Sequence, residues 1–191
     1  MFDLTGKTAL VTGATGGIGA GVARALHAQG ATVAITGRRA AELEALAAEL
    51  GSRVIVAPAD LADPEAPAKL VEKIETEAGS LDILVNNAGF TRDMLALRMG
   101  DADWNAVLEV DLTAPFRLAR AALRGMMKKR QGRIVSIASI VGVTGNAGQA
   151  NYSTAKAGVI HMSRSAAAQL SPKKIRVNAI CPGLSLIHIS E

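Results

Sequence analysis

The chain has 191 residues, of which 49% are hydrophobic and 20% charged, a composition that predicts one globular domain with a sizeable core. The formal net charge of +4 is spread along the chain apart from a short basic cluster at residues 128–130, which argues against a nucleic-acid-binding protein. The sequence shows no signal peptide and no apolar segment of membrane-spanning length, and its one cysteine, Cys181, excludes an internal disulfide. We therefore expect a cytoplasmic protein that binds neither nucleic acid nor membranes.

Short β-branched apolar runs alternate along the chain with Ala-rich segments whose apolar residues recur at three- and four-residue spacing. The runs predict six strands, at residues 8–12, 32–36, 53–57, 82–86, 133–138 and 175–180. The Ala-rich segments predict helices near residues 17–29, 40–50, 64–78, 102–130 and 152–170. Such alternation is typical of right-handed βαβ units, so we predict a doubly wound, Rossmann-like α/β domain with a parallel sheet and helices on both faces.

The segment TGATGGIG, residues 12–19, lies where the first strand gives way to the first helix. Gly13, Gly17 and Gly19 would let the backbone approach a pyrophosphate, whose charge the helix N-terminus would meet. The spacing is G-x-x-x-G-x-G rather than the commoner G-x-G-x-x-G. We interpret the segment as a dinucleotide-binding loop, with a purely structural tight turn as the alternative.

Basic residues follow the second strand, where NAD sites often carry a carboxylate for the ribose hydroxyls. Here Gly37 is followed by Arg38 and Arg39, and an arginine at this place would pair with a 2′-phosphate, so we predict NADP(H). The two arginines could instead be exposed residues at a helix start. After the third strand, Asp60 could bind an adenine amino group or cap the next helix.

Two asparagines, an alanine and a glycine follow the fourth strand as the segment NNAG, residues 86–89. Amide side chains at the carboxyl end of a strand can fix the backbone close to a bound ribose. An Asx-type turn is the alternative. The position of the segment in the series of strand ends favours the ligand-binding interpretation.

A serine, a tyrosine and a lysine form the sharpest pattern of the sequence. Tyr152 and Lys156 of YSTAK are four residues apart on a predicted helix, hence on one face, and an ammonium beside a phenol would lower the tyrosine pKa. Ser139, at the end of the fifth strand, could hydrogen-bond the same substrate oxygen. The pattern predicts proton transfer between Tyr152 and a carbonyl or alcohol oxygen, with the hydride carried by a nicotinamide.

Together, TGATGGIG, NNAG, Ser139 and YSTAK resemble the short-chain dehydrogenase/reductase family over residues 3–183. The longer segments TRDMLALRM (91–99), MMKKRQGRIVSIAS (126–139) and GNAGQANYSTAKAG (145–158) resemble the 3-oxoacyl-[acyl-carrier-protein] reductases of bacterial fatty-acid synthesis. This resemblance implies reduction of a β-keto thioester with NADPH. The alternatives are another short-chain reductase, acting on acyl-CoA thioesters, sugars or secondary alcohols, and a nucleotide-binding fragment without catalysis.

The resemblance also implies roles for individual residues. Tyr152 is expected to act as the general acid, Lys156 to lower its pKa and hold the nicotinamide ribose, and Ser139 to orient the carbonyl. In the reductases, basic residues near the active-site mouth receive the acidic carrier protein, and Arg130 and Lys173 match them in this sequence. The resemblance also implies a homotetramer for the parent enzyme. The residues expected to bind NADPH are Gly13, Thr15, Gly17, Ile18, Gly19, Arg38, Asp60, Leu61, Asn87, Ala88, Gly89, Tyr152, Lys156, Pro182 and Gly183.

The sequence departs from the family pattern at two places. Asp111, in VDLTAPF, stands where the family has a catalytic asparagine that helps hold a proton-relay water, partly through a backbone carbonyl that Asp retains, so Asp111 is expected to be catalytic. After Pro182 and Gly183 the family continues with a nicotinamide-contacting segment, a lid and a seventh strand, whereas this chain reads LSLIHISE. We expect a truncated reductase domain at residues 1–183 that lacks the last strand, and a non-native tail at residues 184–191.

The histidines show no metal-binding pattern. His27 and His161 lie on predicted helices without a second His, Cys or carboxylate at metal-ligand spacing, so surface or packing roles are expected. Ser185 and His188, in the final segment, are given no catalytic role. We therefore predict no metal site.

Overall fold

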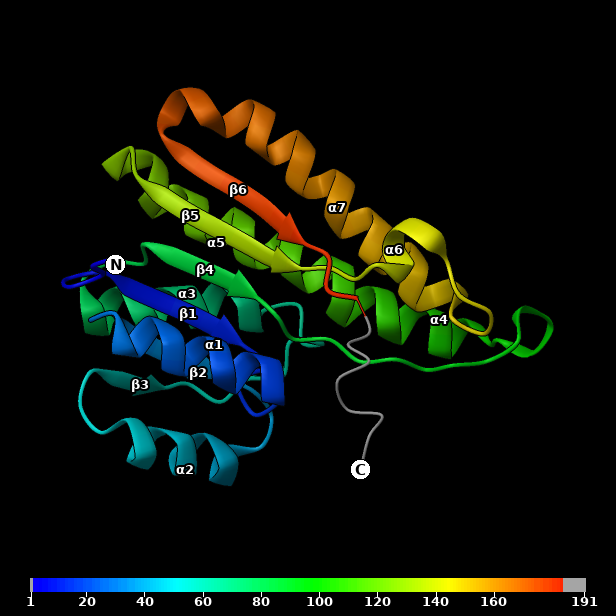
Figure 1. The fold of residues 1–191 in the computed structure, drawn as a ribbon, viewed down its shortest axis with the longest axis horizontal. Coiled ribbons are helices and arrows are strands. Elements are labelled where there is room, and N and C mark those ends of the chain that lie inside the picture. Colours follow the sequence, from blue (N-terminus) through cyan, green and yellow to red (C-terminus); the bar gives the residue numbers. More distant parts are fainter. Residues whose placement is uncertain (1, 184–191) are drawn as a thin grey trace.

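The computed structural model describes residues 2–183, so the expected tail at residues 184–191 lies outside the described part of the chain (Figure 1). Six parallel strands form one sheet in the order β3-β2-β1-β4-β5-β6. The strands are β1 (Thr8–Thr12), β2 (Thr32–Thr36), β3 (Val54–Val56), β4 (Ile83–Asn86), β5 (Gly132–Ile137) and β6 (Ile175–Ile180). This sheet confirms the predicted Rossmann-like α/β fold, and its strand order reverses between β1 and β4, where such sheets form a ligand crevice.

Helices connect successive strands. The chain forms α1 (Gly17–Ala28), α2 (Ala40–Leu50), α3 (Ala66–Ala78), α4 (Asp101–Leu108), α5 (Ala114–Lys129), α6 (Val141–Thr144) and α7 (Ala150–Leu170). The single helix predicted at residues 102–130 is divided by a π-helical turn, η2 (Glu109–Thr113), and two 3₁₀ helices occur at η1 (Ala96–Arg98) and η3 (Ser171–Lys173). The short elements were not predicted, because three or four residues carry too little periodicity to identify a helix.

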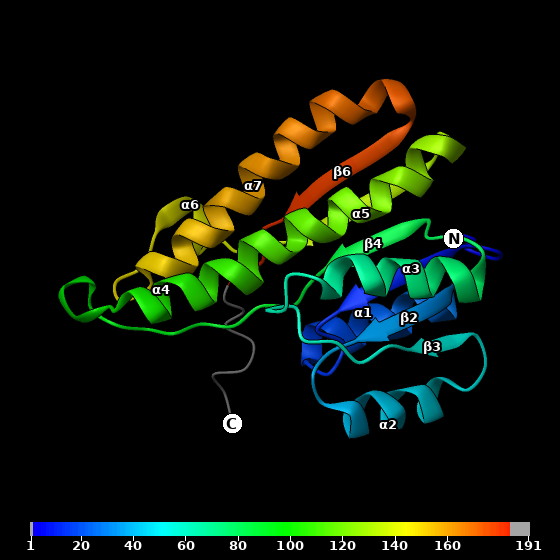
Figure 2. The ribbon, with the colours of Figure 1, turned by 180° about the vertical axis from the view of Figure 1, so that it is seen from behind.

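The helices form a layer on each face of the sheet. Buried residues of α3, α5 and α7, such as Leu70, Leu118 and Leu170, pack on one face of the sheet. Figure 2 shows the molecule from this side, with α3 and α5 in front of the sheet. Ala23 of α1 and Leu43 of α2 pack on the other face. The central strand β1 is buried at all five positions, as expected for a parallel strand that is covered on both sides.

Strands β5 and β6 are buried on one face of the sheet only. Ile134 and Val177, which are paired in the register, are buried against the α5 and α7 layer. Arg133 and Arg176, the preceding pair, point to the opposite face and are exposed. The alternation of apolar and polar residues in these two strands therefore reports one-sided burial.

The parallel register brings the carboxyl ends of the strands to one edge of the sheet. Thr12 at the end of β1 is paired with Thr36 at the end of β2, and Asn86 at the end of β4 is paired with Ser136. The segments that follow these strands therefore leave the sheet side by side. They carry most of the side chains that the sequence marks as candidate ligands.

Candidate functional site

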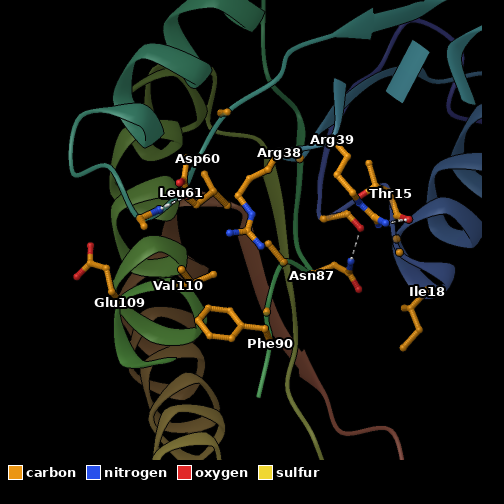
Figure 3. A pocket seen from close by; sticks show the side chains of 18 of the residues that line it. Thr15, Ile18, Arg38, Arg39, Asp60, Leu61, Asn87, Phe90, Glu109 and Val110 are labelled. Atoms are coloured by element: carbon orange, nitrogen blue, oxygen red, sulfur yellow. Dashed lines mark hydrogen bonds between the residues drawn. The ribbon is translucent and has the colours of Figure 1, made fainter. Parts of the chain in front are cut away.

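The segments after β1, β2, β3 and β4 enclose a cavity of about 630 Å³ at the carboxyl edge of the sheet (Figure 3). The cavity lies at the reversal of strand order, the place predicted for a ligand. Its walls include these residues expected to bind a dinucleotide: Gly13, Thr15, Gly17, Ile18, Gly19, Arg38, Asp60, Leu61, Asn87, Ala88 and Gly89. They also include Arg39, Ala62, Phe90, Arg92, Glu109 and Val110, to which sequence reasoning gave no binding role.

Two glycines of the loop after β1 stand where a side chain does not fit. Gly13 has a φ of +64°, and a Cβ there would lie 2.8 Å from the Cα of Ala88. At Gly19 a Cβ would collide with the carbonyl oxygen of Gly13 and come within 2.6 Å of Nδ2 of Asn87. Glycine at these two positions therefore lets the loop after β1 pack directly against the loop after β4, and the N–H groups of a helix start, here that of α1, favour an anion.

The side chain of Asn87 ties the loop after β4 to the loop after β1. Its Nδ2 donates to the carbonyl oxygens of Thr12 at 2.9 Å and of Gly13 at 3.2 Å. The amides of Asn87 and Ala88 both donate to Oγ1 of Thr12 at 2.9 Å. An Asx-type turn would bond the asparagine to its own neighbours, so the contacts of Asn87 differ from that alternative and fix the cavity wall.

Arg38 and Arg39 leave the end of β2 in different directions. Figure 3 shows the Arg38 side chain extending into the cavity between Leu61 and Asn87. Within residues 2–183, no hydrogen-bond or ion-pair partner is found for its guanidinium. This cation is therefore available to a ligand in the cavity.

Arg39 instead holds the glycine loop. One guanidinium nitrogen donates to the carbonyl oxygen of Thr15 at 2.9 Å, and another pairs with Glu42 at 2.7 Å. This structural role was missed, although the spacing of Arg39 and Glu42, three residues apart at the start of a predicted helix, is a signal for a side-chain pair.

Asp60 stabilises the turn after β3. Its Oδ1 accepts the amide of Ala62 at 3.0 Å, as in an Asx turn. The carboxylate is exposed and, with the buried Leu61, forms part of the cavity wall. The alternative that Asp60 caps the next helix is wrong, because α3 begins at Ala66 after Glu65. One carboxylate oxygen serves the turn while the side chain still forms part of the cavity wall.

Ser139, Tyr152 and Lys156 meet beside the cavity. The buried Nζ of Lys156 donates to the carbonyl oxygen of Ile137 at 3.1 Å and lies 5.3 Å from the centre of the Tyr152 ring. The Ser139 hydroxyl, which accepts the Val141 amide at 3.3 Å, is near enough to the Tyr152 phenol to lower its pKa. Gly89 lies between this cluster and the cavity, because a Cβ at Gly89 would be 3.2 Å from Nζ of Lys156.

Asp111 reaches the cluster from the π-helical turn η2. The turn is closed by the Ala114 amide, which donates to the carbonyl oxygen of Glu109, five residues earlier. Pro115 lacks an N–H and cannot donate to the Asp111 carbonyl four residues before it, which favours a local departure from the α-helix. The sequence segment around Asp111 therefore explains why the long helix is interrupted at this point.

The Asp111 carboxylate forms a buried ion pair with Lys156. Its Oδ2 lies 3.2 Å from Nζ of Lys156, and its Oδ1 accepts the Phe90 amide at 3.0 Å. Burial raises the pKa of Asp111, outweighing Lys156 and the Phe90 amide, which lower it. A Cβ at Gly89 would lie 2.5 Å from Oδ2, so the ion pair also requires glycine at the end of the NNAG segment.

The pKa of Tyr152 is raised in this structure, whereas the expected effect of Lys156 was to lower it. Burial raises the pKa of Tyr152, and the carboxylates of Asp111 and, less strongly, Asp93 raise it further, while the hydrogen bond with Ser139 lowers it. The Lys156 ammonium is paired with Asp111, which reduces the stabilisation that it can give to a phenolate. Helical spacing placed the lysine beside the phenol, but it could not show the carboxylate that balances the charge.

Pro182 and Gly183 lie outside the cavity wall, at the other end of the candidate site. They follow β6, and the carbonyl oxygen of Pro182 accepts the Ile140 amide at 3.0 Å. This bond places them beside the segment that carries Ser139. The expected nucleotide-binding residues therefore form two groups, the cavity wall and the region around Ser139, Tyr152 and Lys156.

These features together fit a nicotinamide dinucleotide. The tight turn of Gly13 and Gly19 excludes side chains at both positions and brings the start of α1, a favourable place for a pyrophosphate, to the cavity wall. Arg38, whose guanidinium has no partner in the described part of the chain, suits a phosphate group. The other end of such a ligand would reach Gly89 and the Tyr152 cluster, where a redox-active ring is needed.

Arg130 and Lys173 lie at the opposite edge of the sheet from this cluster. Arg130 ends α5 immediately before β5, and Lys173 ends η3 shortly before β6. A guanidinium nitrogen of Arg130 donates to the Pro172 carbonyl oxygen at 3.3 Å. Ser139 follows the far end of β5, and a six-residue strand spans about 20 Å, so the two basic residues lie far from the Ser139, Tyr152 and Lys156 cluster of the same chain.

Within residues 2–183, no group of three or more His, Cys, Asp or Glu side chains is arranged to hold a metal ion. His161 is exposed on α7, and Nε2 of His27 lies 2.7 Å from the Ser52 carbonyl oxygen. In the same part of the chain, no helix combines the length and apolar character needed to cross a membrane.

Comparison with known proteins agrees with this geometry. The family model "short chain dehydrogenase" matches residues 7–189. Nodulation protein G of Rhizobium sp. (strain N33) is 55% identical over 183 residues, which cover 96% of this chain and 75% of that protein. The 3-oxoacyl-[acyl-carrier-protein] reductase FabG of Escherichia coli (strain K12) is 47% identical over 182 residues, which cover 95% of this chain and 75% of that protein. The chain therefore belongs to the short-chain dehydrogenase/reductase family, whose members are oxidoreductases that bind nicotinamide cofactors.

Proposed function

We propose that the protein reduces 3-oxoacyl thioesters of acyl carrier protein to 3-hydroxyacyl thioesters with NADPH, in fatty-acid synthesis in the cytoplasm. The observation that carries this proposal is that Ser139, Tyr152 and Lys156 lie together beside a cavity whose wall includes Arg38, which has no partner among residues 2–183. The similarity to FabG supports the substrate class. Residues 1–183 form the domain that performs the reaction.

The residues of the cluster divide the chemistry between them. Bound NADPH supplies a hydride to the β-carbon of the substrate. Tyr152 gives its proton to the carbonyl oxygen as the C=O π electrons move onto it, so a C–H and an O–H bond form and a phenolate remains. Ser139 donates a hydrogen bond that orients the same oxygen. Lys156, fixed by Ile137 and Asp111, holds the ribose beside the phenol.

Arg38 selects the cofactor in this proposal. Its guanidinium extends into the cavity and is not engaged by another described residue, so a 2′-phosphate would gain a charge-assisted hydrogen bond there. Arg39, already bonded to Thr15 and Glu42, keeps the adjacent loop in place. We therefore infer a preference for NADPH over NADH.

The proposed carrier-protein contact involves a second copy of the chain. Arg130 and Lys173 are about 20 Å from Ser139 along β5, so a carrier protein docked on them would serve the site of a neighbouring copy. We propose a homotetramer, supported by the exposed Phe116 on α5, which lines an apolar groove of about 260 Å³ between α5 and α7. Light scattering of the purified protein tests this assembly, and a monomer at all concentrations would contradict it.

Turnover with two thioesters tests the proposed substrate. We expect the loss of NADPH absorbance to be faster with an acetoacetyl thioester of acyl carrier protein than with that of coenzyme A, and we expect Tyr152→Phe to abolish it while NADPH still binds. Equal rates, unaffected by Arg130→Glu, would contradict the carrier-protein assignment. The higher identity to nodulation protein G than to FabG favours including other carbonyl substrates in the same assay, and turnover of those alone would identify a different short-chain reductase.

A further inference from the structure

We propose that Asp111 keeps Tyr152 in its protonated form, so that the site supports carbonyl reduction up to alkaline pH and supports alcohol oxidation poorly at neutral pH. This inference rests on the proposed function, because it concerns the direction in which Tyr152 transfers a proton. It starts from the contacts of one buried carboxylate. It goes beyond the assignment of Asp111 to a proton relay.

The Lys156 ammonium is held by oxygen atoms other than the phenol oxygen. Its Nζ lies 3.1 Å from the carbonyl oxygen of Ile137 and 3.2 Å from Oδ2 of Asp111, whereas the centre of the Tyr152 ring is 5.3 Å away. Asp111 is fully buried and Lys156 is 4% exposed, so solvent screens this pair little. The charges of the pair cancel, and the phenolate loses the stabilisation that an unpaired ammonium would give.

Charged and polar groups face Tyr152 from four parts of the chain. They are Asp111 on η2, Lys156 on α7, Asp93 between β4 and η1, and Ser139 after β5. Asp93 is exposed and accepts the Gln149 side-chain amide at 3.0 Å, so solvent weakens its effect. The Ser139 hydroxyl is the only one of the four that favours the phenolate without being paired to a carboxylate. Asp111 is therefore the group whose replacement should change the Tyr152 equilibrium most.

The two directions of the reaction need different forms of Tyr152. In reduction the phenol O–H bond breaks, its proton goes to the substrate oxygen, and NADPH is oxidised by loss of a hydride. In oxidation the phenolate takes the alcohol proton, and NADP⁺ is reduced by the hydride from the carbon. Each pH unit below the tyrosine pKa lowers the phenolate fraction about tenfold. A buried phenol that faces a carboxylate therefore suits reduction.

The phenolate absorbance of Tyr152 tests the inference directly, because Tyr152 is the only tyrosine in the chain. The titration uses rapid pH jumps, so that the fold survives the alkaline step. We expect a wild-type midpoint above the free tyrosine value of about 10 and a midpoint about one pH unit lower in Asp111→Asn. Glu44→Gln, which removes an exposed carboxylate on α2, should cause no shift, and Asp93→Asn a smaller one.

An Asp111→Asn midpoint equal to or above that of the wild type would overturn the proposal, as would a wild-type midpoint below the free value. If Asp111→Asn does not fold, as judged by circular dichroism, Asp111→Ser retains an oxygen near the Phe90 amide and must meet the same expectation. If both variants fail to fold, the wild-type midpoint decides. The titration needs no substrate, so a shift in a protein without thioester turnover would refute the proposed function and leave this inference standing.

Discussion

Nδ2 of Asn87 donates to the carbonyl oxygen of Thr12 at 2.9 Å, which joins the ends of β4 and β1 where the strand order reverses. Replacing Asn87 by Ala removes the side-chain donor for the backbone carbonyl oxygens of Thr12 and Gly13. The loop after β1 then loses its side-chain hydrogen bonds to Asn87. We expect a loss of about 1–3 kcal/mol in unfolding free energy and weaker nucleotide binding. Urea denaturation measures the first effect, with Asn105→Ala on the exposed side of α4 as the control. Equal losses in both variants would contradict the structural role of Asn87.

A matched pair of glycines tests whether the tight packing of the loop after β1 is needed for nucleotide binding. A Cβ at Gly19 meets the Gly13 carbonyl oxygen, whereas a Cβ at Gly21, one half-turn further along α1, has open space. We expect Gly19→Ala to destabilise the fold and to weaken NADPH binding at least about tenfold, since the backbone must move. Gly21→Ala should be neutral or stabilising, because alanine favours a helix over glycine by about 1 kcal/mol. Similar NADPH affinities of the two variants would show that the close packing at Gly19 is not needed for nucleotide binding.

The buried pair of Asp111 and Lys156 predicts a pH-dependent cost of removing the lysine. Lys156→Met leaves the carboxylate buried without its cation, which should cost about 3 kcal/mol of stability at neutral pH. The folded-state pKa of Asp111 is already raised by burial and should rise further in this variant. A carboxyl group with a raised folded-state pKa favours the fold most below its unfolded value and loses that contribution as the pH rises through the folded-state pKa.

The expected deficit of Lys156→Met is therefore small in acid and grows toward neutral pH. Thermal unfolding as a function of pH measures it. The double variant Lys156→Met with Asp111→Asn is the control, since it removes the unpaired charge and should lose this pH dependence. A deficit that is constant with pH in both proteins would indicate that Asp111 is not charged in the wild-type fold.

Asp82 gives the opposite pH dependence. Burial tends to raise its pKa, but the Thr8 amide, which donates to Oδ2 at 3.0 Å, and Lys129, 3.2 Å from Oδ1, outweigh burial and lower it. The stability from these contacts is present above the unfolded pKa of about 3.9 and is lost as the pH falls through the lower folded-state value. Asp82→Asn should cost about 1–2 kcal/mol at neutral pH and less in acid.

The Asp82→Asn prediction is checked by urea denaturation at several pH values. Asp101→Asn, at the exposed start of α4, provides the control. If Asp82→Asn is equally destabilising at neutral pH and below the folded-state pKa of Asp82, the charge of this side chain contributes nothing, and its hydrogen bonds alone explain the effect.

Much of the fold follows from local patterns in the sequence. The run TALVT of β1, with three consecutive apolar residues, predicted a strand buried on both faces, and helical segments between such runs predicted a parallel sheet. Once the sheet is parallel, the residues after each strand must share an edge, which is why Gly13, Asn87 and Asp60 could be assigned to one cavity. These inferences need only periodicity and strand direction.

Other features depend on distances that no local pattern encodes. The pairing of Asp111 with Lys156 joins residues on η2 and α7, and the Asp111 carboxylate adds to the burial that raises the Tyr152 pKa. The distance of Arg130 from the Tyr152 cluster could not be predicted, because matching by sequence position says nothing about the edge of the sheet at which a residue lies. The π-helical turn was missed because the apolar periodicity continues through it, although Pro115 was a signal for an interruption.

The most direct test of the account is equilibrium binding of NADPH and NADH to the wild-type chain and to Arg38→Ala. The account predicts tighter binding of NADPH, and a loss of roughly ten- to hundredfold in NADPH affinity in Arg38→Ala with NADH affinity unchanged. Arg176→Ala, which removes an exposed arginine of β6, should bind both cofactors like the wild type. Equal affinity of the wild-type chain for NADPH and NADH, or an unchanged NADPH affinity in Arg38→Ala, would contradict the assignment of the cavity as an NADPH site in which Arg38 binds the 2′-phosphate.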